Sequence, residues 1–316
     1  MNPHLAIIKQ IKRQLATVIV GQKSMIDGLL IGLLNDGHIL LEGPPGLAKT
    51  LTISTLARTL QLQFQRIQFT PDLLPADLLG TEIYNPKTGE FSTRKGPVFS
   101  NIVLADEINR APPKVQSALL EAMQERQVTI GECSFGLPSP FLVLATQNPI
   151  EHEGTYPLPE AQSDRFLLKI KVGYPSKQEE REVVLRSRRE RPMVEAVVNQ
   201  EDLANCKRGL QQLRFEDVVL EYIIDLVRAT RHPKSYGLSM QRYISNGASP
   251  RATMALEQAA RTHAFLLGRG FVSPDDVKDM AHAVLRHRVL LTYEADAEGI
   301  TSDDIIDMIL QKVSIP

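Results

Sequence analysis

The chain has 316 residues, enough for two domains, with 43% apolar and 23% charged residues and a formal net charge of −1. This near-neutral charge argues against nucleic acid as a constitutive partner, because phosphate backbones favour basic surfaces. Two cysteines, Cys133 and Cys206, are too few for a disulfide framework or a zinc cage, which favours a reducing, cytoplasmic compartment. No apolar run is long enough to cross a bilayer, so membrane insertion is not expected.

The N-terminal segment is predicted to form an amphipathic surface helix, because its apolar residues recur at helical spacing. These residues are Ile8, Ile11, Leu15 and Val18. Lys9, Lys12 and Arg13 interrupt the segment, so it does not resemble a signal peptide.

A phosphate-binding loop is predicted at residues 43–50, GPPGLAKT. The apolar run HILLE at 38–42 has the length of a strand and precedes it. A helix with an apolar face at Ile53, Leu56, Ala57 and Leu60 follows, and its N-terminus would direct free N–H groups at a phosphate. The usual pattern is G-x-x-x-x-G-K-[ST], and Ala48 replaces its second glycine. Alanine is acceptable there if it adopts right-handed helical angles.

An acidic strand end is predicted further along the chain. A strand around Phe64–Phe69 is followed by a β-hairpin at 81–96, where β-prone residues flank the turn Pro-Lys-Thr-Gly. The next strand runs from Ile102 to Asp106, with Glu107 behind it. The first carboxylate can help to hold Mg²⁺ beside the hydroxyl of the threonine that ends the loop, and the second can polarise the attacking water.

A second hairpin is expected at 127–141, before a strand at 141–146 that leads to Asn148. The amide of Asn148 can donate to a γ-phosphate and orient water; the alternative is an ordinary turn residue before proline. The polar segment EHE at 151–153 lacks the spacing of metal ligands and is expected to be a loop. A last strand is predicted at 166–172.

These strands, alternating with helices, predict an α/β fold with a five-stranded, mostly parallel sheet and helices on both faces. Ligands of such sheets bind beyond the carboxyl ends of the strands. The loop at 43–50, Asp106, Glu107 and Asn148 all follow strand ends, so they can converge on one nucleotide.

A domain boundary is expected between a core at 1–173 and a helical domain at 174–316. In the second domain, Ser249 suits an N-cap and Pro250 the first helical position, which places Arg251 in a first turn that can face a phosphate. Another helix, opened by Ser273-Pro274, has its apolar face at Val277, Met280, Ala281 and Val284.

Together these motifs resemble the MoxR family of AAA+ ATPases over essentially the whole chain. The resemblance is carried by GPPGLAKT, DLLPADLLGTEIYNPKTGEF, GPVFSNIVLADEINRAPPKVQSALLEAMQERQVTIG, ATQNP, PLPEAQSDRFLLKI and GASPRA. Alanine before the lysine is usual in that family. The resemblance implies a P-loop AAA+ core with β-hairpin inserts and a C-terminal all-helical lid domain.

The resemblance also implies ATP and Mg²⁺ as ligands. Lys49 would contact the β- and γ-phosphates, Thr50 and Asp106 would hold Mg²⁺, and Glu107 would be the catalytic base. The positions that would contact ATP are Val20, Gly21, Gly43, Pro44, Pro45, Gly46, Leu47, Ala48, Lys49, Thr50 and Leu51. The first two belong to IVGQ, which would lie beside the adenine base.

Three further residues match catalytic positions of the family. Asn148 resembles sensor 1, Arg251 resembles sensor 2, and Arg165 resembles the arginine finger that one subunit presents to its neighbour. Arg165 directly precedes an apolar strand, at the edge of the sheet away from its own phosphate site. The alternative for Arg165 is a structural ion pair with Asp164 or Glu160.

The family resemblance implies a homo-oligomeric, hexameric ring that remodels a protein client. The implied partner is a protein with a von Willebrand factor A domain, and the implied task is the maturation of metal-dependent enzymes or complexes. The hairpins could grip the client, or they could be plain surface loops. Alternative functions are an AAA+ DNA motor, a metal-chelatase-type ATPase subunit, and a non-enzymatic switch that binds ATP; the last would have no need of Glu107.

Overall fold

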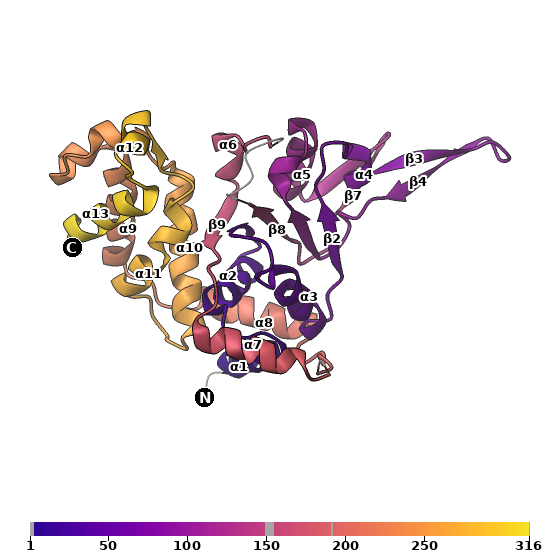
Figure 1. Ribbon diagram of the computed structural model, residues 1–316, viewed down its shortest axis with the longest axis horizontal. Coiled ribbons are helices and arrows are strands. Elements are labelled where there is room, and N and C mark those ends of the chain that lie inside the picture. The colour runs from indigo at the N-terminus through magenta and orange to yellow at the C-terminus, as the bar shows by residue number, and fades with distance from the viewer. Residues whose placement is uncertain (1–2, 149–154, 191, 316) are drawn as a thin grey trace. The chain divides into compact units, whose positions relative to one another are not determined.

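The computed structural model describes residues 3–148, 155–190 and 192–315, and contacts divide the chain into two compact units (Figure 1). We call them the core unit, Ile7–Arg165 with Ile170–Leu203, and the lid unit, Met1–Ala6 with Phe166–Lys169 and Ala204–Pro316. Residues 170–203 are grouped with the core because they pack on it: Val197 N donates to Thr59 O at 3.0 Å. This division falls later than the expected boundary between residues 173 and 174, which stays a prediction.

A five-stranded sheet forms the centre of the fold, with strand order β2-β5-β8-β1-β9. The strands are β1 (His38–Glu42), β2 (Phe64–Gln68), β5 (Ile102–Asp106), β8 (Leu142–Gln147) and β9 (Phe166–Lys171). β2 pairs with β5, β5 with β8 and β8 with β1, each in parallel. The predicted parallel α/β sheet is confirmed, and its strands occur where the apolar runs placed them.

Burial explains which strands are central. β5 and β8 are buried along their lengths up to the last residue, as expected for strands covered on both faces. β2 lies at an edge of the sheet, where Ile67 is buried while Arg66 and Gln68 are exposed. This alternation places Arg66 and Gln68 on one face of β2, since side chains two apart in a strand point the same way.

His38 anchors the start of β1 inside the core unit. Val143 N donates to His38 Nδ1 at 3.0 Å, so Nε2 carries the ring hydrogen and donates to Met123 O at 3.2 Å. Burial, followed by the charge of Arg126, lowers the pKa of His38 to about 3. The neutral ring therefore ties β1 to β8 and to the helix that contains Met123.

The helices that belong mainly to the core unit cover this sheet and lead into its loops. They are α1 (Pro3–Val18), α2 (Lys23–Leu34), α3 (Lys49–Thr59), α4 (Pro75–Leu79), the 3-10 turn η1 (Ile108–Arg110), α5 (Pro113–Glu125), α6 (Glu160–Ser163) and α7 (Lys177–Ser187). Of the predicted apolar face of α1, Ile8, Ile11 and Leu15 are buried, whereas Val18 is half-buried.

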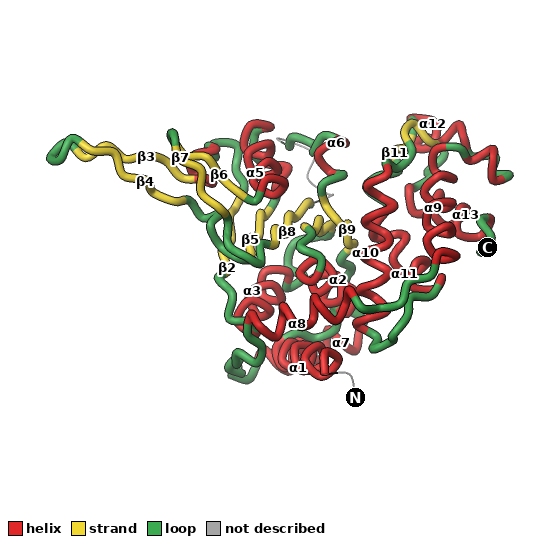
Figure 2. The backbone as a smooth tube through the Cα atoms, turned by 180° about the vertical axis from the view of Figure 1, so that it is seen from behind, coloured by secondary structure: helices red, strands yellow, loops and turns green. Residues whose placement is uncertain are grey.

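Two antiparallel hairpins project from the core unit, as predicted. β3 (Gly80–Asn85) and β4 (Glu90–Lys95) form a long arm that extends away from the sheet (Figure 2). β6 (Gln127–Ile130) and β7 (Cys133–Gly136) form the second hairpin. Lys95 Nζ lies 4.9 Å from the ring centre of Phe99 and 4.8 Å from that of Phe135, which ties the base of the arm to the second hairpin.

The lid unit is mostly helical, as predicted. Its elements are α8 (Gln200–Gln211, which begins in the core unit), α9 (Asp217–Arg231), η2 (Pro233–Tyr236), η3 (Gln241–Tyr243), β10 (Ile244–Asn246), α10 (Pro250–Leu266), α11 (Pro274–Leu285), β11 (Leu290–Leu291), α12 (Tyr293–Ala297) and α13 (Ser302–Lys312). β10 and β11 make a two-stranded antiparallel sheet that an all-helical domain would not contain. It joins the segment before α10 to the segment after α11.

The predicted apolar face of α11 is confirmed at Val277, Ala281 and Val284, which are buried, whereas Met280 is half-buried. The segment EHE at 151–153 lies outside the described residues. Among the described residues, no helix combines the length and apolar character that a bilayer crossing requires.

Candidate functional site

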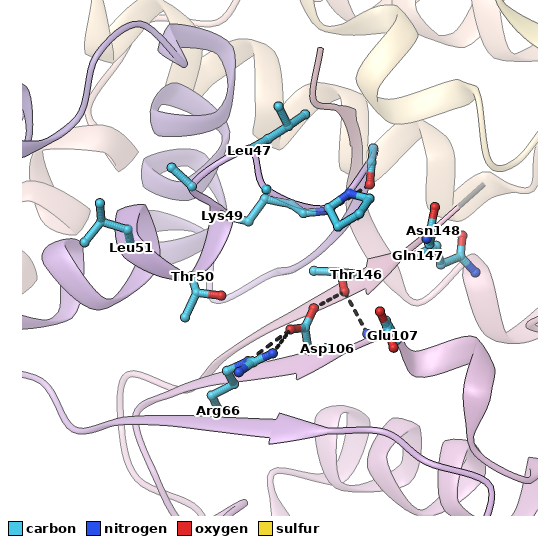
Figure 3. Close-up of a pocket in the computed structure, with 14 residues that line it drawn as sticks. Leu47, Lys49, Thr50, Leu51, Arg66, Asp106, Glu107, Thr146, Gln147 and Asn148 are labelled. Atoms are coloured by element: carbon cyan, nitrogen blue, oxygen red, sulfur yellow. Dashed lines mark hydrogen bonds and ion pairs between the residues drawn. The ribbon is translucent and has the colours of Figure 1, made fainter. Parts of the chain in front are cut away.

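A pocket of about 480 Å³ opens at the carboxyl ends of β1, β5 and β8 in the core unit (Figure 3). Its lining comes from the predicted phosphate loop, Arg66 of β2, the acidic strand end and the end of β8. The lining residues are Gly43, Pro45, Gly46, Leu47, Ala48, Lys49, Thr50, Leu51, Arg66, Asp106, Glu107, Thr146, Gln147 and Asn148. The structure therefore brings together residues that the sequence places in four separate segments.

The phosphate loop owes its shape to its backbone. A Cβ on Gly43 would lie 2.4 Å from Val172 O, so only glycine fits this close approach. Gly46 has a φ of +84°, in the region that glycine adopts readily, and a Cβ there would meet nothing within 4 Å. The loop thus turns sharply while the space beside Gly46 stays open.

The expected conformation of Ala48 was wrong. Ala48 is the N-cap of α3 with φ 55° and ψ 20°, in the left-handed region rather than the right-handed helical one. The reason is that it precedes the helix: its carbonyl accepts from Thr52 N at 2.9 Å, while its own angles complete the turn of the loop. This conformation costs an alanine roughly 1 kcal/mol.

Lys49 begins α3 and lies over the loop. Its Nζ donates to Gly43 O at 2.8 Å, which folds the side chain back across the loop. Burial lowers the pKa of Lys49, whereas the nearby carboxylates of Asp106 and Glu107 oppose that shift. An ammonium group has three hydrogens to donate, so this bond leaves donors for a bound phosphate.

Asp106 ends β5 and is held by neighbours on both sides (Figure 3). Arg66 Nη2 and Nε donate to its Oδ2 at 2.7 and 3.0 Å. The buried Thr146, near the end of β8, donates from Oγ1 to its Oδ1 at 2.6 Å. Thr146 Oγ1 also accepts from Glu107 N at 2.8 Å and so couples the two acidic residues to β8.

Glu107 follows Asp106 in the left-handed conformation, with a φ of 57°. Gln68 Nε2 donates to its Oε2 at 2.8 Å, and Arg110 Nη1 donates to the same oxygen at 3.2 Å. Oε1 accepts no such bond from the described residues. The carboxylate is therefore oriented through one oxygen while the other is available to a water molecule.

Sequence reasoning missed Arg66, Gln68 and Thr146. The alternation of FQRIQ in β2 was the available signal, because it puts Arg66 and Gln68 on one face next to the strand that carries Asp106. The sequence places Thr146 at the end of a strand, two residues before Asn148, and assigns it no role. Arg66 and Gln68 belong to no short motif with a fixed spacing, and although Thr146 lies within ATQNP, the motif does not indicate its contact with Asp106.

The pocket residues fit a nucleotide with Mg²⁺. The hydroxyl of Thr50 and the carboxylate of Asp106 are hard oxygen ligands of the kind that Mg²⁺ prefers, and both line the pocket. The N-terminus of α3 supplies backbone N–H groups and a positive dipole end for phosphates. The volume lies within the usual range of small-molecule sites.

The remaining predicted positions are divided between the pocket and its surroundings. Leu47, Leu51 and Asn148 line the pocket, whereas Pro44, Val20 and Gly21 are not among its lining residues. Gly21 has a φ of +65° and packs against the Glu179 carboxylate at the start of α7. Contact of Val20 and Gly21 with adenine stays a prediction.

Arg165 lies in a separate recess of the core unit. Its Nη1 donates to Leu120 O at 2.8 Å, while its buried Nε has no partner in the described structure. Ser117, Leu120, Glu121, Gln124, Glu125 and Gln162 line this recess with it, and none of them lines the nucleotide pocket. The alternative of a structural ion pair between Arg165 and Asp164 or Glu160 stays a prediction.

Arg251 lies in the first turn of α10 in the lid unit. Ser249 is the N-cap, and its Oγ accepts from Arg251 N at 3.2 Å, which confirms the predicted start of this helix. The role of Arg251 toward a phosphate stays a prediction.

Comparison with known proteins places the chain in a family. The model of the ATPase family associated with various cellular activities (AAA) matches residues 38–168, and the model of the AAA lid domain matches residues 239–309. The protein named Chaperone MoxR1 of Mycobacterium tuberculosis is 50% identical, over 95% of this chain and 80% of its own. Protein MoxR of Methylorubrum extorquens is 32% identical, over 96% of this chain and 94% of its own.

A solved structure supports the same relationship. The crystal structure of a protein from Cytophaga hutchinsonii, assigned as an ATPase, matches with a TM-score of 0.93 and 52% identity, covering 99% of this chain and 96% of its own. These relatives span nearly the whole sequence and share the fold that carries the phosphate loop and the acidic strand end. The chain therefore belongs to the MoxR family of AAA+ ATPases.

Proposed function

We propose that this protein hydrolyses ATP with Mg²⁺, works as a hexameric ring in the cytoplasm, and remodels a protein client. The observation that carries the proposal is the convergence of Lys49, Thr50, Asp106, Glu107 and Asn148 on one pocket. A protein that only bound ATP would need the phosphate loop but not an oriented carboxylate beyond it.

The chemistry follows from the groups in the pocket. Lys49 would bind the β- and γ-phosphates, and Thr50 and Asp106 would hold Mg²⁺, which supplies charge stabilisation when it is bound. Glu107 would accept a proton from water at Oε1, since Gln68 and Arg110 both donate to Oε2. Asn148 would orient that water or donate to the γ-phosphate.

The position of Arg165 supports a ring. Its recess shares no residue with the nucleotide pocket, so an action of Arg165 on ATP would cross from one subunit to the next. Contacts of this head-to-tail kind close into a ring when the rotation between subunits permits. The number of six subunits is taken from the family resemblance and is part of the proposal.

The exposed arm supports the client part of the proposal. Ile83, Tyr84 and Phe91 are 43%, 54% and 67% exposed on β3 and β4, and the rings of Tyr84 and Phe91 lie 5.1 Å apart. Exposed apolar clusters of this kind are typical of surfaces that contact another protein. The relative named Chaperone MoxR1 is consistent with a protein client. The family resemblance suggests a partner with a von Willebrand factor A domain.

Phosphate release tests the enzymatic part. The purified protein should release phosphate from ATP in the presence of Mg²⁺ and should stop when EDTA removes the metal. Addition of single- or double-stranded DNA should leave the rate unchanged. A rate that depended on DNA would instead favour a DNA motor.

Retention of a client tests the remodelling part. Glu107→Gln should hold ATP and therefore retain a client in a pull-down that contains ATP. Lys49→Ala, which lacks the phosphate contact, should retain none. A variant with Tyr84→Ser and Phe91→Ser in the Glu107→Gln background should bind ATP equally well but lose the client. Equal retention by all three variants would contradict a client held by the ATP-bound arm.

A further inference from the structure

Asp106, the carboxylate expected to hold Mg²⁺, already has a cation beside it. Arg66 contacts Oδ2 through both Nη2 and Nε, at 2.7 and 3.0 Å, while Thr146 contacts Oδ1 at 2.6 Å (Figure 3). Both oxygens of Asp106 thus accept hydrogen bonds, and Oδ2 accepts two of them. A metal ion or one of its waters would have to compete with these donors for the carboxylate.

Of the two donors, Arg66 is the one that can leave. The side chain of Arg66 is 49% exposed, whereas Thr146 is 2% exposed and is fixed by its second bond to Glu107 N. An ion pair with a partner this exposed contributes little to the stability of the fold, so its release costs little. Arg66 therefore contributes little to the stability of the core unit, and its main effect is to neutralise the charge of Asp106.

Gln68 connects Arg66 to the second carboxylate of the pocket. Arg66 Nη2 donates to Gln68 Oε1 at 2.7 Å, and Gln68 Nε2 donates to Glu107 Oε2 at 2.8 Å. Both side chains project from β2 on one face, and β2 pairs in register with β5. Displacement of Arg66 would remove its hydrogen bond to Gln68. Gln68 in turn donates to Glu107, the proposed base, so the two carboxylates are linked through β2.

We propose that Arg66 is a built-in counter-cation of the metal site, which neutralises Asp106 in the absence of nucleotide and is displaced when Mg²⁺ binds with the nucleotide. The inference rests on the proposed function, because it takes Asp106 as a metal-holding residue. Two cations would compete for one carboxylate, since the guanidinium of Arg66 already donates twice to Oδ2 and Mg²⁺ would be held through the same group. Arg66 is thus a positioning residue that sets the Mg²⁺ concentration required for Mg²⁺-dependent nucleotide binding.

The test is the Mg²⁺ dependence of nucleotide binding. Fluorescent ADP is titrated against the full-length protein at a series of Mg²⁺ concentrations and in EDTA. Arg66→Met keeps the length of the side chain but removes the charge. It should lower the Mg²⁺ midpoint, the Mg²⁺ concentration at which half of the gain in ADP binding is reached, by about two- to fivefold. Binding in EDTA should stay unchanged. Arg66→Lys, which keeps a cation, should fall between Arg66→Met and the wild type.

Arg110→Met is the matched control, because Arg110 forms a comparable pair with Glu107 rather than Asp106. It should leave the Mg²⁺ midpoint unchanged. Thermal melting should show that every variant is folded.

Three results would overturn the inference. One is a midpoint that does not move in Arg66→Met, and another is a midpoint that moves equally in Arg110→Met. The third is weaker ADP binding by Arg66→Met in EDTA, which would mean that Arg66 contacts the nucleotide itself. A wild-type protein that bound no nucleotide at any Mg²⁺ concentration would overturn the proposed function, and this outcome is distinct from an unmoved midpoint.

Discussion

The two halves of the nucleotide pocket are built in different ways. The phosphate loop is shaped by backbone, through the left-handed angles of Gly46 and Ala48 and the close approach of Gly43 to the backbone of Val172. The acidic half is shaped by side chains that reach Asp106 and Glu107 from other elements, β2, β8 and η1. A site made by backbone is confined to one short stretch of sequence, whereas a site made by side-chain contacts is spread along the chain.

The difference separates two tasks. We expect the phosphate loop to determine whether a nucleotide binds and the acidic half to determine whether it is hydrolysed. Variants in the loop should therefore change binding, and variants of the proposed base Glu107 should change turnover at similar affinity.

The largest effect is expected for Lys49→Ala. Lys49 is the only lysine among the residues that line the described pocket. Without its ammonium group, nucleotide binding should fall below detection. Fluorescent-ATP titration measures this loss directly. Lys9→Ala, which removes an exposed lysine of α1, serves as the control and should bind like the wild type. Binding by Lys49→Ala at wild-type affinity would disprove the phosphate loop.

Arg165→Ala should leave binding intact and lower hydrolysis on the order of a thousandfold, because an arginine supplied from outside the pocket stabilises the charge of the transition state. Mixed with Glu107→Gln and allowed to exchange subunits, it should regain activity at interfaces that pair an intact Arg165 with an intact Glu107. The mixing ratio is varied at fixed total protein, and assembly is followed by light scattering. If co-assembly is demonstrated and no ratio restores activity, Arg165 does not act between subunits.

The smallest effects are expected at Ala48, where two substitutions sharpen the account of the loop. Ala48→Gly relieves the left-handed strain but adds freedom to the unfolded chain, so the free energy of unfolding should change by less than about 1 kcal/mol. Ala48→Val should cost about 1–3 kcal/mol, because a β-branched residue resists a positive φ. Urea unfolding measures both. Equal stability of the two variants would mean that Ala48 is not left-handed.

The sheet could be predicted from sequence because its strands are buried apolar runs of the right length. HILLE at 38–42 and the run that ends at Asp106 needed no information beyond their own residues. The hairpin arm was equally predictable, since Pro86–Gly89 form a recognisable turn between β-prone segments. The convergence of the phosphate loop with Asp106, Glu107 and Asn148 followed from the rule that such sheets bind ligands at their carboxyl ends.

Other features depend on contacts between distant residues and could not be predicted in this way. The pairing of Arg66 with Asp106 joins residues 40 positions apart and requires β2 to lie beside β5 in one register. The left-handed angles of Ala48 follow from how the loop enters α3, which propensity alone does not determine. The strands β10 and β11, of three and two residues, are too short to give a periodic pattern.

The central claim is that binding and hydrolysis reside in separate halves of one pocket, and Glu107→Gln tests it most directly. ATP affinity and phosphate release are measured on the same preparation. Glutamine keeps the size and hydrogen bonding of glutamate but cannot accept the proton. ATP should bind near the wild-type affinity while turnover falls by about a hundredfold or more. Near-wild-type turnover, or a loss of binding that matches the loss of turnover, would contradict the division of the site.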